Sequence, residues 1–252
     1  MSHNSTTRFS NKVENYIKYR PHYPIEVIDY LKSENILKKD SVIADIGSGT
    51  GISAEMFLKN GNTVYGVEPN KEMREAAECL LSNYKNFISV NGTAEVTSLG
   101  IHSIDLIVAA QAFHWFDFDK TKAQFKRILK PKGNVVLLWN ARLTDTTPFL
   151  KDYEKMLVDY GTDYLEVRHD NLGKVVFEDF FEGKYSIKTF KNFQLFDYDG
   201  VKGRLLSSSY IPAESDPNYK PMLNELKRIF GMHNKNGRVS IEYETQVIAG
   251  KL

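Results

Sequence analysis

Short apolar runs alternate with amphipathic stretches along the first half of the chain. Apolar runs bounded by turn residues favour buried strands, and apolar positions that repeat every three or four residues favour helices. We interpret this half as five strand–helix repeats, which predict a parallel sheet because crossover connections are right-handed. The predicted strands are at 42–46, 63–67, 86–90, 103–110 and 134–139. The predicted helices are at 12–19, 25–33, 52–60, 69–81 and 119–129.

The second half of the chain is less regular. Residues 148–160, 200–209 and 217–230 have helical periodicity, and residues 185–190 and 237–248 alternate as strands do. We expect the last strand to lie antiparallel to the sixth strand. The helices between these two strands exceed what a hairpin needs, so we expect them to form a cap together with residues 142–182. The predicted fold class is therefore α/β, a doubly wound, seven-stranded and mostly parallel sheet with a helical cap.

We expect a single domain over residues 1–252. Its expected parts are N-terminal lid helices at 1–35, a ligand-binding core at 36–140, cap insertions at 141–183 and 197–235, and final strands at 184–191 and 237–250.

The composition limits the possible partners. The chain has 252 residues, a formal net charge of +1 and one cysteine, Cys79. A near-neutral balance gives no reason to expect a nucleic acid as partner. One cysteine excludes an internal disulfide framework and a cysteine-rich zinc site, and we predict no metal. No apolar run approaches the roughly 20 residues of a membrane span, and residues 1–10 lack the apolar region of a signal peptide. We expect a cytoplasmic protein that does not bind membranes, and its oligomeric state stays open.

Three glycines at alternate positions follow the first predicted strand, in the run Asp45-Ile46-Gly47-Ser48-Gly49-Thr50-Gly51. A strand, a glycine turn and a helix form the nucleotide crevice of open α/β sheets, because glycine lets a ligand lie against bare backbone. A dinucleotide fingerprint needs a further glycine where this chain has Ile52.

The run resembles the cofactor loop of class I S-adenosylmethionine-dependent methyltransferases of the small-molecule branch (methyltransferase type 11-like). Their fold is a Rossmann-like sheet. The resemblance implies S-adenosylmethionine as cofactor and an acid at the strand end that suits a cationic ligand. It places Asp45, Gly47, Ser48, Gly49 and Gly51 at this cofactor. The alternative is a structural glycine turn without a ligand.

Two later acids match the same resemblance. Glu68 lies 21 residues after Gly47, where an α/β nucleotide site needs a carboxylate for the ribose hydroxyls, and Pro69 follows it. An NAD enzyme would also need Glu68, and the alternative is a surface carboxylate that caps the next helix. Ala94 and Glu95 match the pair with which the family contacts adenine, through a backbone N–H and a carboxylate. The alternative for this pair is a turn that caps a short helix.

The run Gln111-Ala112-Phe113-His114-Trp115 follows the fourth predicted strand and resembles the loop beside the transferable methyl group. The resemblance implies that Gln111 and Ala112 contact the cofactor and that the acceptor is a small molecule. The chain lacks the Asn/Asp-Pro-Pro-Tyr and Pro-Cys motifs used on nucleic-acid bases. His114 is a candidate general base, because its unperturbed pKa lies near physiological pH. The alternative, which we favour, is that His114 packs the cofactor wall.

The run Tyr19-Arg20-Pro21-His22-Tyr23-Pro24 resembles the segment that closes over the cofactor in this family. It implies cofactor contacts for Tyr19 and Arg20, with Arg20 on the methionine carboxylate. His22 is a second candidate base, and the alternative for the segment is an aromatic–proline turn on the surface.

We therefore expect methyl transfer to an oxygen, nitrogen or carboxylate nucleophile of a small molecule. Two rival hypotheses stay open, namely a non-catalytic S-adenosylmethionine-binding protein and a nicotinamide-dependent oxidoreductase.

Overall fold

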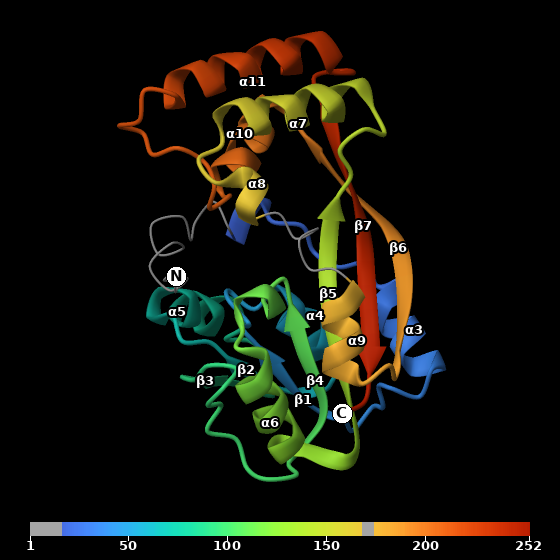
Figure 1. The fold of residues 1–252 in the computed structure, drawn as a ribbon. Helices are drawn as coiled ribbons and strands as arrows, with labels where there is room; N and C mark the ends of the chain where they lie inside the picture. Colours follow the sequence, from blue (N-terminus) through green and yellow to red (C-terminus); the bar gives the residue numbers. More distant parts are fainter. Residues whose placement is uncertain (1–16, 168–173) are drawn as a thin grey trace.

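The computed structural model describes residues 17–167 and 174–252 (Figure 1). They form a seven-stranded sheet in the order β3-β2-β1-β4-β5-β7-β6. Neighbouring strands from β3 to β5 are parallel, and β7 is antiparallel to both β5 and β6. The predicted fold class is confirmed, including the antiparallel last strand. The predicted helix at 12–19 lies mostly outside the described residues.

Most of the strands and helices that the apolar pattern predicts are present. The strands are β1 (Val42–Ile46), β2 (Thr63–Val67), β3 (Phe87–Val90), β4 (Ile104–Ala110), β5 (Leu129–Arg142), β6 (Tyr185–Phe196) and β7 (Val239–Gly250). The helices are α3 (Glu26–Ser33), α4 (Ile52–Lys59), α5 (Lys71–Leu80), η2 (Phe113–Trp115), α6 (Phe118–Ile128), α7 (Pro148–Tyr160), α8 (Tyr164–Val167), α9 (Lys174–Phe181), α10 (Tyr198–Leu206) and α11 (Tyr219–His233).

Alternate side chains of the central strands enter two separate apolar layers. Ile107 and Ala109 of β4 pack with residues of α6 and α9, whereas Leu106 and Val108 pack with residues of α3 and α4. This alternation follows from the two-residue period of a strand. Helices therefore cover both faces of the sheet, as a parallel sheet requires.

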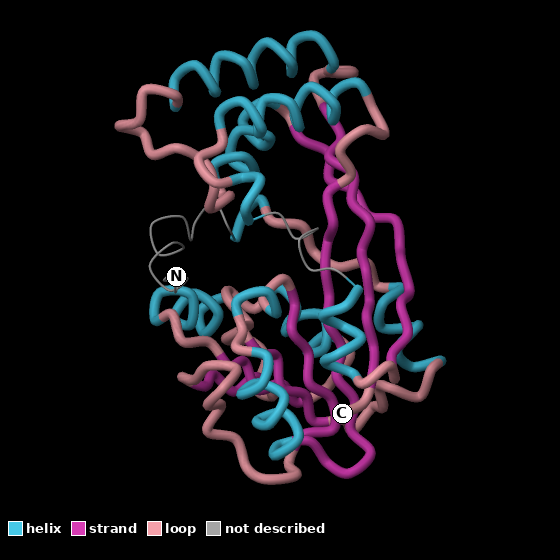
Figure 2. The backbone as a smooth tube through the Cα atoms, in the orientation of Figure 1, coloured by secondary structure: helices cyan, strands magenta, loops and turns pink. Residues whose placement is uncertain are grey.

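Three strands extend beyond the others and carry the cap. The long strands β5, β6 and β7 run from the lower body to the upper group of helices (Figures 1 and 2). There α7, α8, α10 and α11 share an apolar cluster with Val239, Ile241 and Tyr243 of β7. The apolar pattern predicts that β5 ends at residue 139 and β6 at residue 190. Both continue because Asn140–Arg142 pair with Tyr243–Thr245, and residues 191–196 pair with residues 239–244.

Three expectations about local structure are wrong. The segment between β3 and β4 contains no α-helix, so the repeats number fewer than five. The strand predicted at 134–139 begins earlier, because β5 starts at Leu129 and includes residues 130–133. The register shifts there, since Ile104 pairs with Leu129 while Leu106 pairs with Asn134. Helix α9 does not belong to the cap, although residues 141–183 were expected there. Its Phe177, Phe180 and Phe181 pack in the cluster that contains Phe113 and Phe125.

Within the described residues, no helix combines the length and the apolar character that a membrane span requires.

Candidate active site

The glycine loop between β1 and α4 forms the floor of the site. Gly47, Gly49 and Gly51 all have positive φ, of 70°, 55° and 86°. A Cβ atom on Gly47 would lie 2.6 Å from the Cβ of Ala112, and one on Gly51 would lie 2.6 Å from Cδ1 of Leu81. A Cβ on Gly49 would meet no atom within 4 Å. Gly51 is thus needed for packing against α5 and Gly47 for the close approach of Ala112, whereas Gly49 leaves bare backbone beside open space.

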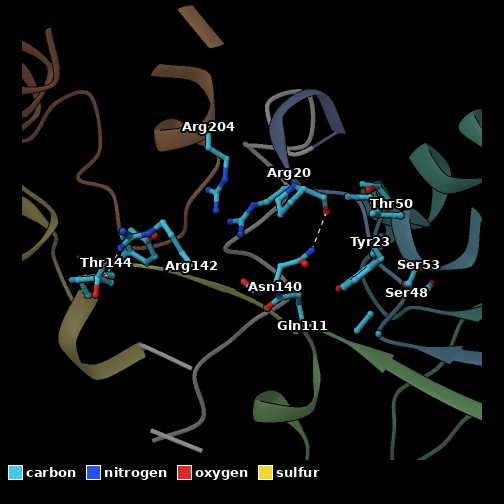
Figure 3. A pocket seen from close by; sticks show the side chains of 17 residues that line it. Arg20, Tyr23, Ser48, Thr50, Ser53, Gln111, Asn140, Arg142, Thr144 and Arg204 are labelled. Carbon is cyan, nitrogen blue, oxygen red and sulfur yellow. Dashed lines mark hydrogen bonds between the residues drawn. The ribbon is translucent and has the colours of Figure 1, made fainter. Parts of the chain in front are cut away.

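Two compartments meet at this loop. Both are lined by Gly47, Gly49, Ala110 and Gln111. The first, which we name the Glu68 compartment, is also lined by Glu68, Pro69, Asn70, Met73, Thr93, Ala94, Glu95, Ala112, Trp115 and Phe116. The second, which we name the arginine compartment, is also lined by Arg20, Pro21, Tyr23, Ser48, Thr50, Ile52, Ser53, Asn140, Arg142, Thr144, Tyr164, Arg204 and Tyr210 (Figure 3).

Glu68 lies at the end of β2 and is 8% exposed. Its Oε2 accepts a hydrogen bond from the backbone N–H of Gly49 at 2.9 Å, and its Oε1 accepts one from Asn70 at 2.8 Å. Burial raises the pKa of this carboxyl. Asn70 rather than Glu68 caps α5, because its Oδ1 accepts from the backbone N–H of Met73 at 2.9 Å. A carboxylate oxygen has two lone pairs, so both oxygens can still accept from a diol in the compartment.

Asp45 does not line either compartment, in contrast to its expected cofactor contact. It is fully buried behind the loop and accepts a hydrogen bond from Oγ of Ser53 at 2.6 Å. Burial raises the pKa of Asp45 to about 7. Asp45 therefore connects β1 to the first turn of α4 and supports the loop from behind.

Five other predicted residues lie together around the Glu68 compartment. Pro69, Ala94, Glu95, Gln111 and Ala112 all line it. Oε1 of Glu95 accepts from the backbone N–H of Asp117 at 3.0 Å, which holds the carboxylate at the start of α6. Gln111 has a positive φ of 56°, and its Nε2 donates to the carbonyl of Asn140 at 3.3 Å. Sequence reasoning missed Met73, Thr93 and Phe116, because apolar and hydroxyl side chains on these segments carry no distinctive signal.

The segment before α3 is attached to the cap and the sheet. Arg20 lines the arginine compartment, and its Nη2 donates to the carbonyl of Ser207 at 2.8 Å. Asn140 donates to the carbonyl of Pro21 at 3.4 Å, the contact that Figure 3 draws. Tyr19 was expected at the cofactor but does not line either compartment. Its ring instead packs on α10, where a Cβ on Gly203 would lie 2.0 Å from Cε2 of Tyr19.

Neither histidine expected as a candidate base lines the two compartments. His114 lies in η2 against Trp115, with their ring centroids 4.7 Å apart. Since Trp115 lines the Glu68 compartment and His114 does not, the expectation that His114 packs the cofactor wall stays a prediction. The side chain of His22 is 64% exposed, and its Nδ1 lies 3.8 Å from Oε2 of Glu55 on the surface. His22 contributes its backbone carbonyl, which accepts from Nδ2 of Asn192 at 2.8 Å.

The cap contributes two buried arginines that sequence reasoning did not identify. Arg142 at the end of β5 forms an ion pair with Glu154 and donates to the hydroxyl of Tyr164 at 2.8 Å. Arg204 on α10 donates to the hydroxyls of Tyr243 at 3.1 Å and Ser208 at 3.1 Å. Arg204 lies on α10 together with Asp199 and Lys202, so its position in the sequence carries no distinctive signal, and its convergence with Arg142 depends on the cap.

Known proteins with a similar sequence or a similar fold are methyltransferases. Residues 44–137 match the family model of the methyltransferase domain. An uncharacterized methyltransferase-like protein of Schizosaccharomyces pombe is 31% identical over 156 residues, which are 62% of this chain and 59% of that protein. A structure described as a candidate type II methyltransferase from Anaeromyxobacter dehalogenans superposes with a TM-score of 0.69 at 18% identity, covering 92% of this chain and 98% of that one.

A more distant structure was solved with its ligand. Phosphoethanolamine N-methyltransferase 2 of Haemonchus contortus, in complex with S-adenosylmethionine, has a TM-score of 0.55 at 17% identity. The alignment covers 98% of this chain and 58% of that one. Residues 44–137 of the present chain thus match the methyltransferase domain that its motifs resemble, and its fold is the Rossmann-like fold of the similar structures. It spans about half to three fifths of the length of the curated relatives that it matches first.

Proposed function

We propose that the protein transfers the methyl group of S-adenosylmethionine to a small molecule. The observation that carries this proposal is the junction of the two compartments at Gly47, Gly49, Ala110 and Gln111. One compartment has a carboxylate beside the glycine loop, and the other is polar and covered by the cap. This arrangement suits a nucleoside on one side and an acceptor on the other.

The residues present fit S-adenosylmethionine. When bound, this cofactor supplies a methyl group that its sulfonium activates for in-line transfer. Glu68 has the acceptor oxygens that ribose hydroxyls need. Ala94 and Glu95 line the same compartment and would contact the adenine. The guanidinium of Arg20 has the planar donor geometry for the methionine carboxylate. Gly49, which has no atom within 4 Å of its missing Cβ, allows a ligand to approach the backbone.

The contribution of the chain to the reaction would be placement. Backbone and side-chain donors on the glycine loop, on β4 and on the segment at Arg20 would orient the donor. The cap would orient the acceptor against it. Correct orientation alone can supply much of a rate enhancement, because it converts a bimolecular step into an effectively unimolecular one.

Replacement of Glu68 by alanine tests this assignment. The variant should bind S-adenosylhomocysteine about 2–3 kcal/mol more weakly, because charged hydrogen bonds to the ligand would be lost. Titration calorimetry would measure the difference, and circular dichroism would verify the fold.

Glu75→Ala provides the matched control. Glu75 lies on the adjacent helix α5, and its exposed side chain is 3.6 Å from Nζ of Lys71. This variant should bind S-adenosylhomocysteine as the wild type does. Equal affinity of a folded Glu68→Ala variant and the wild type would show that Glu68 only supports the loop.

A further inference from the structure

Positively charged side chains gather in the arginine compartment. Arg20, Arg142 and Arg204 all line it, and Figure 3 shows the guanidinium groups of Arg20 and Arg204 directed into the same space. The described lining residues include no carboxylate. Glu154, behind the wall, pairs with Arg142. A buried charge is costly unless it is paired, so this compartment favours an anionic occupant.

Arg204 is buried, and its described hydrogen-bond partners are neutral. It is 7% exposed, and within the described part of the chain its guanidinium donates to the hydroxyls of Tyr243, Ser207 and Ser208. These groups are neutral, so they orient the guanidinium without balancing its charge. The hydroxyl of Tyr243 in turn donates to Oε1 of Gln194 at 2.9 Å, which fixes its position.

Arg142 also retains an unused donor. Its side chain is 9% exposed, and it donates through Nη2 to Glu154 and to Tyr164. Its Nη1 is buried without a hydrogen-bond partner among the described residues. A buried donor of this kind costs free energy until a ligand or water accepts from it.

The methyl donor itself cannot balance this charge. S-adenosylmethionine carries an ammonium, a sulfonium and one carboxylate, so its net charge is positive. If its carboxylate binds Arg20, Arg204 and Nη1 of Arg142 still face the acceptor. The acceptor should therefore bring the negative charge, and planar carboxylates match the donor geometry of guanidinium groups.

We propose that the acceptor is a small di- or tricarboxylate, with one carboxylate held by Arg142 and Arg204 and another methylated. This assignment rests on the proposed methyltransferase function. A carboxylate is ionised at neutral pH, so its oxygen is nucleophilic without a general base. The phenol of Tyr164 lines the compartment, and burial raises its pKa, which makes it a hydrogen-bond donor rather than a base.

The product of this step is a methyl ester. One carboxylate oxygen uses a lone pair to form the O–CH₃ bond while the S–CH₃ bond breaks. The electron pair of the broken bond stays on sulfur, which becomes a neutral thioether. The carboxylate loses its negative charge in the ester, and no proton is transferred.

The proposal is tested by calorimetry on the full chain saturated with S-adenosylhomocysteine. The probes are succinate, tricarballylate, the neutral succinamide and glycerol 3-phosphate. We expect binding of the carboxylates and none of the amide. Incubation with S-adenosylmethionine should then give an ester that mass spectrometry detects and mild base hydrolyses. Binding of S-adenosylhomocysteine without binding of either carboxylate would overturn this proposal alone, as would a preference for the phosphate. Absence of S-adenosylhomocysteine binding would instead overturn the proposed function.

Substitutions of Arg142 and Arg204 test whether these side chains hold the carboxylate of the acceptor. Arg204→Gln and Arg142→Gln should each weaken carboxylate binding about 10- to 100-fold, the effect of losing a charged hydrogen bond. Each should keep the affinity for S-adenosylhomocysteine. Arg228→Gln is the control, because Arg228 lies on α11 with an exposed side chain paired to Glu225. An equal loss of both ligands in the two arginine variants would assign these residues to the donor and contradict the proposal. The wild-type panel decides the substrate class even if one variant does not fold.

Discussion

A Gly47→Ala variant should lose about 3 kcal/mol of stability and bind S-adenosylhomocysteine about 100-fold or more weakly. Two effects contribute to the expected loss in the free energy of unfolding. A non-glycine residue in the left-handed region costs roughly 1–2 kcal/mol, and forcing a methyl group into packed surroundings costs roughly 1–3 kcal/mol. The φ of Gly47 is 70°, and the new Cβ would lie 2.6 Å from the Cβ of Ala112. To remove this steric clash, either the glycine loop or the segment at Ala112 must move. Gly47 and Ala112 both line the Glu68 compartment, so the affinity for the ligand falls.

Gly61→Ala separates these two effects. Gly61 also has a positive φ, of 93°, but a Cβ there would meet no atom within 4 Å. This variant should lose only the conformational part, roughly 1–2 kcal/mol, and keep its ligand affinity. Denaturant unfolding and calorimetry measure both quantities. Equal losses of stability and affinity in the two variants would contradict the assigned role of Gly47.

The second large effect is expected at Gly203 on α10. A Cβ there would lie 2.0 Å from Cε2 of Tyr19, so Gly203→Ala must displace the ring. We expect a loss of about 3 kcal/mol in the free energy of unfolding, the upper part of the usual range for overpacking. Tyr19 precedes Arg20, and the carbonyl of Tyr19 accepts from Nε2 of Gln194 at 3.2 Å. Displacement of Tyr19 should therefore also weaken S-adenosylmethionine binding through Arg20.

Gly231→Ala is the matched control for this variant. Gly231 lies within helix α11, and a Cβ there would meet no atom within 4 Å. Alanine should stabilise the helix by roughly 0.5–1 kcal/mol, because alanine has the higher helix propensity. Opposite signs of the two changes in thermal or denaturant unfolding are the expected result. A neutral Gly203→Ala with unchanged ligand affinity would show that Tyr19 does not hold the segment in place.

The sequence predicts those parts of the fold in which the local pattern of apolar residues agrees with the tertiary structure. Strands buried on both faces are continuous apolar runs, and the turn after β1 needs glycines at fixed positions. The Glu68 compartment was therefore largely predictable, since Glu68, Ala94 and Gln111 all follow predicted strands. The carboxyl ends of parallel strands meet at one edge of a sheet, so these residues converge.

The arginine compartment could not be predicted in the same way. Arg142 lies beyond the point where the apolar run of β5 ends, and Arg204 lies on a helix of the cap. Their convergence depends on pairing of β5 with β7 beyond Asn140 and on the packing of α10 against Tyr243. Asp45 shows that a position in the sequence does not reveal the direction of a side chain. Its sequence position matched a cofactor contact, but its carboxylate is directed toward Ser53 behind the loop.

The identity of the bound nucleotide tests the central claim most directly. Calorimetry on the wild-type chain should show binding of S-adenosylmethionine and S-adenosylhomocysteine, with no heat of binding for NAD or NADP. Ile52 stands where a dinucleotide fingerprint has its last glycine, and the arginine compartment continues the site toward the cap instead. Binding of either dinucleotide, together with no binding of S-adenosylhomocysteine, would contradict the account.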